Sequence, residues 1–256
     1  MRMANVLIVC LVTRVASHGI FWSPTSRAQL AQLSGWESDA TKIIAEPMPE
    51  VAHGREYPGG RPWAEPGKSV SNVGPCGMKS YGQKTNWNHP EHGWGPVQAT
   101  FNAGEVIDIS WCVSNHADHG GLYSYRMCSD PKITAKFIDG AYTPNEGDMA
   151  EMEDCFQKGI LACTDVPGQK CPVHPDCKDG WGCMQSRAWF NCGPKDGGRC
   201  RSRGNETCTT HEGPGTILRD QVKLPNLVSN HTLIGFRWDC QDTPQLWLHC
   251  ADVTLL

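Results

Sequence analysis

The sequence has no apolar run long enough to cross a membrane as a helix, since its longest apolar stretch covers only residues 4–12. It also has no excess of basic residues, because 23 Lys and Arg are outnumbered by 27 Asp and Glu. That balance argues against nucleic acid or an anionic membrane surface as a partner. Internal repeats are absent, and helical periodicity is rare. We therefore expect a soluble, monomeric, single-domain protein with no nucleic-acid or membrane partner.

The first 17 residues have the pattern of a secretory signal peptide. Arg2 precedes the apolar stretch, and the small residues Val15 and Ser17 lie at positions −3 and −1 of a cleavage site. We therefore predict a signal peptide over residues 1–17 and a secreted, extracellular mature domain over residues 18–256 that begins with His18. A buried N-terminal strand is the alternative interpretation of this segment.

The cysteines lack the paired C-x2-C spacing of a zinc site. Thirteen of the 14 lie beyond the predicted signal peptide, and in an exported chain they indicate a disulfide framework. Eight fall within residues 144–215, a stretch with few aliphatic residues that we interpret as a disulfide-rich insertion. Sequons for N-glycosylation begin at Asn205 and Asn230 and predict a glycoprotein.

Alternating apolar residues indicate a β-rich fold. Residues 22–98 are rich in Gly, Pro, Trp and His, and we expect mainly long loops there, with one short helix over residues 26–33. Strands are predicted over residues 106–113, 122–128, 216–224, 233–240 and 246–256. The predicted fold is all-β, an immunoglobulin-like or fibronectin-like β-sandwich with long loops and the disulfide-rich insertion.

A histidine at a mature N-terminus has a particular metal chemistry. Its free α-amine and its imidazole Nδ1 can chelate one ion, and a third nitrogen from another histidine completes a T-shaped site that suits copper. His116 and His119 lie in the turn between two predicted strands, where a side chain can reach such a site. The alternative is that cleavage falls before a histidine by coincidence.

The turn Ala117-Asp118-His119 and the last segment, residues 242–253, together with His18 resemble lytic polysaccharide monooxygenases. Members of that family begin with histidine and carry an Ala-x-His turn, a register in which His116 lacks the preceding alanine. The resemblance implies one copper ion bound by the His18 amine and by the rings of His18 and His119. It also implies an external reductant and H2O2 or O2 as cosubstrate.

The same resemblance assigns roles to two residues of the last strand. Gln245 matches a position that hydrogen-bonds the oxygen cosubstrate, and Trp247 matches the axial position, which holds Tyr or Phe in the family. The alternative is an ordinary strand glutamine followed by a buried tryptophan.

The substrate is predicted from the finer resemblance. Residues 18–27 and 72–77 look like auxiliary-activity families 15 and 17, and the insertion is most similar to family 17, oomycete enzymes that attack homogalacturonan in pectin. This implies a plant cell-wall polysaccharide as partner. The local run of Lys195, Arg199, Arg201 and Arg203 offers cations to such a polyanion, and a solvated loop is the alternative interpretation of that run. Chitin or cellulose, a non-catalytic copper-binding module and a metal-free secreted effector are the alternatives.

Overall fold

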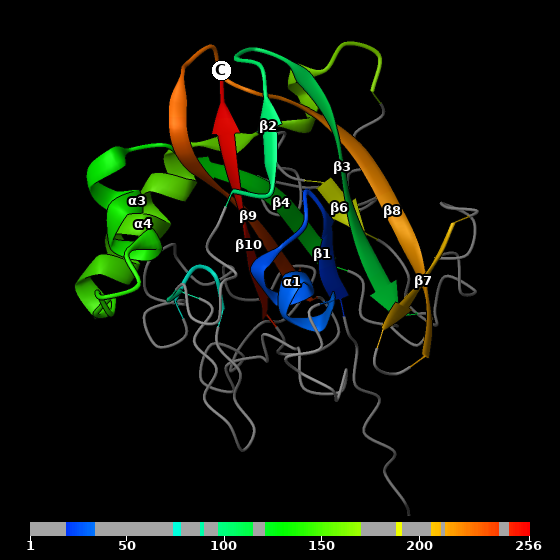
Figure 1. Ribbon diagram of the computed structural model, residues 1–256. Coiled ribbons are helices and arrows are strands. Elements are labelled where there is room, and N and C mark those ends of the chain that lie inside the picture. The colour runs from blue at the N-terminus through cyan, green and yellow to red at the C-terminus, as the bar shows by residue number, and fades with distance from the viewer. Residues whose placement is uncertain are drawn as a thin grey trace, which may run out of the picture.

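Two β-sheets face each other in the computed structural model (Figure 1). The structure describes residues 19–33, 74–77, 88–89, 97–114, 121–169, 188–190, 206–210, 213–240 and 246–256. None of the helices in these ranges is long and apolar enough to cross a membrane.

The smaller sheet has four strands in the order β1-β3-β8-β7, and each pair of neighbouring strands is antiparallel. Its strands are β1 (Gly19–Ser23), β3 (Val106–Ser114), β7 (Thr207–Thr210) and β8 (Gly213–Lys223).

The larger sheet has six strands, five of them in the order β2-β10-β9-β4-β5, while β6 pairs with β4. Its strands are β2 (Ala99–Phe101), β4 (Gly121–Cys128), β5 (Ile160–Leu161), β6 (Ala188–Phe190), β9 (Ser229–Cys240) and β10 (Leu246–Leu255). Only β2 and β10 pair in parallel among these described strands. The predicted β-sandwich and its five predicted strands are confirmed.

The core lies between the sheets and follows the two-residue period of the strands. In β9, Ile234, Phe236 and Trp238 face inward, and the alternate residues face outward. Aromatic rings dominate this core: the Trp111 ring lies 5.1 Å from Phe236 and 4.9 Å from Trp238, centroid to centroid. Such pairs bury large apolar areas and favour tilted geometry, so this layer joins the two sheets firmly.

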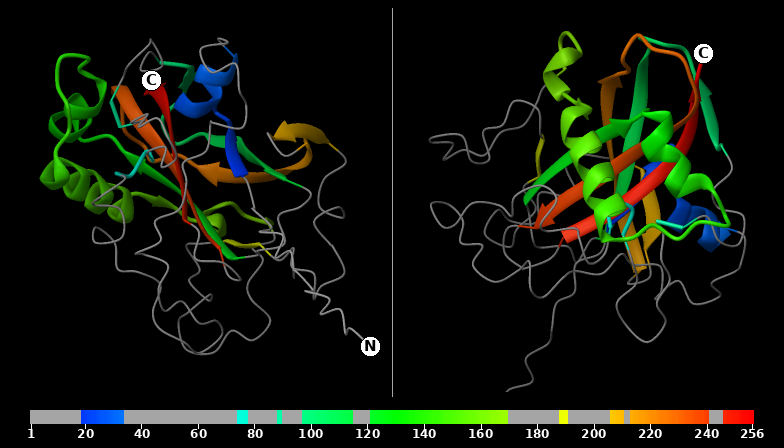
Figure 2. Two further views of the ribbon diagram at one scale, coloured as in Figure 1. Left: turned by 90° about the horizontal axis from the view of Figure 1, so that it is seen from below. Right: turned by 90° about the vertical axis from the view of Figure 1, so that its left-hand side faces the viewer.

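Helix α1 (Arg27–Leu33) confirms the predicted short helix, and the Ser26 hydroxyl accepts a hydrogen bond from the Gln29 amide at its start. Helices α3 (Pro131–Ile138) and α4 (Glu146–Lys158) were not predicted. They lie side by side against the outer face of the larger sheet (Figure 2). Only one short 3₁₀ turn, Cys163–Asp165, adds to these helices in the described part of the chain.

Two cysteines of residues 144–215 form disulfides with strands of the sandwich. Cys155 pairs with Cys128 of β4, and Cys208 pairs with Cys112 of β3. A third disulfide joins Cys76 to Cys250 across 174 residues. The disulfide framework is confirmed, and two of its bridges fasten the predicted insertion to core strands.

Candidate functional site

Strand termini of both sheets meet at one end of the sandwich. Gly19 pairs with Val113 near the end of β3, Gly121 pairs with Cys240 at the end of β9, and Leu246 pairs with Asp239 at the start of β10. In Figure 1 the arrowhead of β3 points down and that of β10 points up to the C-terminus, so this end is at the bottom. We call it the tryptophan end, after Trp111, Trp238 and Trp247, whose rings lie just inside it.

The two sheets are in close contact at the tryptophan end. A Cβ atom at Gly19 would lie 3.1 Å from ring carbons of Trp238 and 3.2 Å from the ring of Trp111. That is tighter than ordinary contact, so the backbone at the start of β1 rests directly on these two rings. Glycine permits this approach because it has no side chain of its own.

Most of the predicted site residues lie outside the described residues. His18, His116, His119 and Gln245 all belong to this group. Chain connectivity nevertheless relates three of them to the tryptophan end. His18 directly precedes Gly19 of β1, His119 is two residues before β4, and Gln245 directly precedes β10.

Trp247 is the one predicted site residue that the structure describes. Its side chain is buried, and its ring stacks on Trp238 with centroids 6.2 Å apart and 24° between the planes. Trp247 is the second residue of β10, and its side chain faces inward at the tryptophan end. Burial is what both interpretations of Trp247 require, so its axial role stays a prediction.

A buried histidine that sequence reasoning missed lies on the same face of β10. His249 Nε2 is 3.2 Å from the carbonyl oxygen of Gly19, and the ring lies 6.1 Å from that of Phe236. Burial lowers the pKa of His249 to about 4, against a weaker opposing effect of the Gly19 hydrogen bond, so the ring is neutral at pH 7. Its position two residues after Trp247, on an inward-facing register, is the signal that could have found it.

A buried ion pair joins the beginning and the end of the described chain. Arg27 Nε and Nη2 donate to the two carboxylate oxygens of Asp252, each at 2.7 Å, and Nη2 also donates to the Phe137 carbonyl at 2.8 Å. His231 Nε2 lies 2.8 Å from the same carboxylate. Both members of the pair are fully buried, and such bidentate contacts fix orientation as well as distance. The opening segment is thereby fastened to β10.

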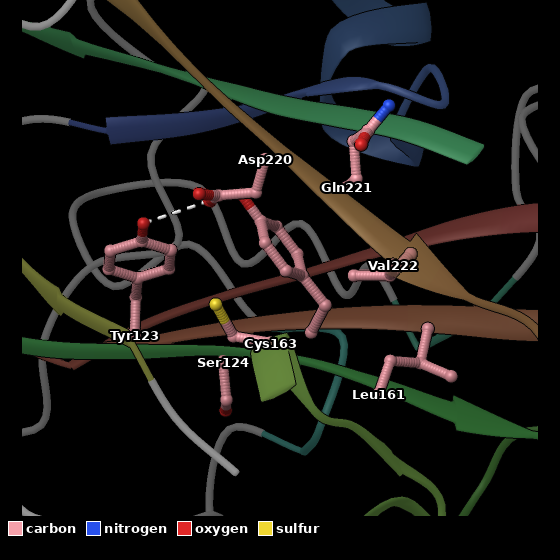
Figure 3. A pocket seen from close by; sticks show the side chains of 8 residues that line it. Tyr123, Ser124, Leu161, Cys163, Asp220, Gln221 and Val222 are labelled. Carbon is pink, nitrogen blue, oxygen red and sulfur yellow. Dashed lines mark hydrogen bonds between the residues drawn. The ribbon is translucent and has the colours of Figure 1, made fainter. Parts of the chain in front are cut away.

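A second polar cluster lies between β4 and β8 in a shallow pocket (Figure 3). The hydroxyls of Tyr123 and Tyr125 donate to the same oxygen of Asp220, at 2.8 and 3.0 Å. Burial, and then the charge of Asp220, raise the pKa of Tyr125 well above its ordinary value. The pocket has one carboxylate and no histidine among its lining residues, so it does not offer a copper site.

The donor chemistry at the tryptophan end suits copper. Two histidines, His18 and His119, lie within two residues of its strand ends, and histidines provide the nitrogen donors that copper favours. Within the described ranges, no group of three or more His, Cys, Asp or Glu side chains could hold a metal ion.

A sequence profile described as "Lytic polysaccharide mono-oxygenase, cellulose-degrading" matches residues 18–253. The chain belongs to the lytic polysaccharide monooxygenase family. Members of this family are copper-dependent oxidoreductases, which confirms the enzyme class predicted from the sequence.

Curated lytic polysaccharide monooxygenases share about a third of their residues with this chain. It is 34% identical over 260 residues to the AA13 family lytic polysaccharide monooxygenase A of Pyricularia oryzae, covering 100% of this chain and 65% of that protein. It is 36% identical over 253 residues to the lytic polysaccharide monooxygenase aasB of Emericella nidulans, covering 96% of this chain and 73% of that protein. The chain thus spans only about two thirds of the first relative's length.

Among solved structures, a chitin-binding domain from Burkholderia pseudomallei has the same fold. It superposes with a TM-score of 0.51 at 14% sequence identity, covering 94% of this chain and 100% of that chain. In sequence, this chain is similar to a family 13 protein, and the finer resemblance to families 17 and 15 stays a prediction.

Proposed function

We propose that this chain is a secreted lytic polysaccharide monooxygenase that cleaves glycosidic bonds oxidatively with one copper ion. The main support for this proposal is that strands β1, β4 and β10 all begin at the tryptophan end. Chain connectivity keeps His18, His119 and Gln245 within two residues of these strand starts. The family match, which begins at residue 18, supports the same assignment.

The proposed metal ligands are nitrogen atoms. The α-amine and Nδ1 of His18 would bind the ion after removal of residues 1–17, and the ring of His119 would complete the site, with His116 as the alternative third ligand. When bound, copper would supply redox chemistry toward H2O2 or O2 with electrons from an external reductant.

The chain's own residues would hold and shield this centre. Gln245 would donate a hydrogen bond from its side-chain amide to the oxygen cosubstrate. Trp247 faces the core, so its buried ring would close the inner side of the site and exclude water there. A polysaccharide would then approach from the outer side.

The first test is copper binding by protein that begins at His18, measured by calorimetry and electron paramagnetic resonance. We expect tight binding with a three-nitrogen spectrum, and a loss of at least a hundredfold in affinity when one residue precedes His18, because the amine becomes an amide. His119→Ala should remove the signature, whereas the matched control His116→Ala should keep it. Unchanged affinity in the extended protein would contradict the proposed ligand set.

Two polymer classes are candidates for the substrate. A neutral glucan is favoured because the description of the family that matches residues 18–253 names cellulose degradation. Homogalacturonan is favoured by the cationic cluster at Lys195, Arg199, Arg201 and Arg203, which lies outside the described residues. A polyanion would need such local cations on a chain of net charge −4.

The substrate assay uses copper-loaded protein, ascorbate and H2O2 with starch, cellulose, chitin and homogalacturonan, and mass spectrometry identifies oxidised fragments. Products from starch or cellulose alone would support the neutral glucan. Uronate products that diminish between tens and hundreds of millimolar salt would instead favour the cationic cluster and pectin. Copper binding without product from any polymer would identify a non-catalytic module.

A further inference from the structure

Strand β1 is an edge strand that has a second attachment besides its sheet. It pairs with β3 on one side and begins the order of the smaller sheet. At its first residue, the Gly19 carbonyl oxygen lies 3.2 Å from Nε2 of His249, which belongs to β10 of the other sheet. A side chain of one sheet thus bonds the backbone of the other.

The hydrogen-bonding pattern defines the state of the His249 ring. A carbonyl oxygen only accepts, so Nε2 carries the proton and donates it to Gly19. The ring is neutral at pH 7 because burial lowers its pKa to about 4. Its other nitrogen, Nδ1, is buried and has no hydrogen-bond partner among the described residues. An apolar ring would fill this space without leaving an acceptor unpaired, so the bond to Gly19 is what a histidine adds here.

The contacts of Gly19 determine the direction in which the chain continues to residue 18. Glycine has the freest backbone of any residue, so without restraint it would leave its neighbour poorly placed. Here the rings of Trp238 and Trp111 face the position that a Cβ atom of Gly19 would take, and its carbonyl oxygen is hydrogen-bonded to His249. These two contacts restrain the position of Cα and the ψ angle of Gly19, and the antiparallel pairing with Val113 restrains the same residue from the β3 side.

We propose that His249 is a positioning residue for the metal ligand His18. The inference rests on the proposed function, since it assumes that the His18 amine and ring bind copper. A chelate formed by one residue must meet a third nitrogen from a separate loop, so any looseness at Gly19 lowers affinity. By holding the Gly19 carbonyl, His249 fixes the backbone from which both His18 nitrogens project.

Two variants separate the hydrogen bond from packing. His249→Phe keeps a buried ring but removes the donor, and His249→Gln keeps an amide donor of similar reach. Val253→Ala is the matched control, because it opens a cavity on the same inward face of β10, farther from the tryptophan end. Calorimetry gives the copper affinity, and electron paramagnetic resonance reports the ligand geometry.

We expect His249→Phe to bind copper about threefold to tenfold more weakly, the equivalent of one lost hydrogen bond, with a shifted spectrum. His249→Gln should restore both, and Val253→Ala should change neither even if it is less stable. Wild-type affinity in His249→Phe, or an equal loss in Val253→Ala, would overturn the positioning role.

Hydrogen exchange on the metal-free protein distinguishes this inference from the proposed function. Amides of β1, residues 19–23, should exchange faster in His249→Phe than in wild type and in His249→Gln. Unchanged exchange there would refute the anchoring of β1 by His249, whatever the copper result. If wild type itself bound no copper, the proposed function and with it the positioning role would fall, while exchange would still report on the anchor.

Discussion

Two buried ionic networks support different parts of this molecule. In the first, Asp252 of β10 spreads both carboxylate oxygens over Arg27, and His231 contacts one of them. In the second, a single oxygen of Glu153 in α4 accepts from Arg126 at 2.6 Å and from Arg237 at 3.0 Å. All of these carboxylates and guanidiniums are buried.

The networks differ in what they connect. The Arg27–Asp252 pair spans 225 residues and fastens the segment that follows β1 to the last strand. The Glu153 network joins α4 to β4 and β9 on the outer face of the larger sheet, where α3 and α4 pack (Figure 2). Similar ion pairs therefore connect different parts of the molecule: the first joins the opening segment to β10, and the second joins the helical face to the larger sheet.

The largest expected effect is the removal of either carboxylate. Asp252→Asn and Glu153→Gln should each lower the free energy of unfolding by about 3–5 kcal/mol, because each leaves buried guanidinium charge uncompensated. Denaturant unfolding of the metal-free proteins measures this. We expect the folded Asp252→Asn protein to bind copper more weakly than wild type, because only this network fastens the opening segment. The copper affinity of Glu153→Gln should stay unchanged. Equal affinities would show that the two networks do not differ in function.

Acid should destabilise the protein through His249 at the tryptophan end and through the Glu153 network at different pH values. Burial lowers the pKa of His249 from its ordinary value of 6.5 to about 4 in the folded protein, so between these values the unfolded chain binds a proton that the folded chain does not. Stability should therefore fall from about pH 6.5 toward pH 4, by at most about 1.4 kcal/mol per unit. His249→Gln should lack this loss in unfolding experiments across that range.

Glu153 responds at lower pH. Burial raises its pKa, but the charges of Arg126 and Arg237 outweigh burial and hold the pKa below the ordinary 4.5. Its contribution is therefore complete above about pH 4.5 and is lost as pH falls through the lower, folded value. If the free energy of unfolding changed equally with pH in wild type and His249→Gln between pH 6.5 and 4, the loss of stability in that range would not come from His249.

The smallest expected effects come from the helix caps. Ser26 caps α1 through the Gln29 amide, and Asn145 caps α4 in a capping box with Asp148. Ser26→Ala and Asn145→Ala should each lower the free energy of unfolding by about 1 kcal/mol. Hydrogen exchange in β1 should increase only for Ser26→Ala, since α1 directly follows that strand. An increase in both variants would indicate that the two regions are coupled.

The sandwich could be predicted because strand alternation carries most of the information. Residues 106–113 alternate between apolar and polar positions, and residues 246–256 are a short, mainly apolar run. They form β3 and β10 with bounds within one residue of those predicted. The family resemblance likewise rested on segments that prove to be joined, since Arg27 of the opening motif pairs with Asp252 of the closing one.

The helical face was missed although local signals were present. Asp130 caps α3 ahead of Pro131, and Asn145 with Asp148 forms the capping box of α4. The density of cysteines in residues 144–215 led to an interpretation as an insertion stapled by disulfides. Disulfide pairing cannot be deduced from the spacing of cysteines in the sequence. The disulfides of Cys155 and Cys208 with core strands therefore could not be predicted.

The candidate site could be predicted only in part. A histidine beyond a cleavage site and a histidine turn suggest a metal by chemistry alone. The register two residues after Trp247 could have placed His249 in the core, but its contact with Gly19, 230 residues away in sequence, could not be predicted.

Strand β10 has a consequence for how the protein acquires its structure. It lies between β2 and β9 inside the larger sheet, yet it is formed by residues 246–255, after every other described strand in sequence. Its pairings with β2 and α1 close loops of well over a hundred residues, which raises contact order and slows folding. The larger sheet cannot be completed until these residues are available, so a nascent or truncated chain without them would expose the apolar edges of β2 and β9 to aggregation.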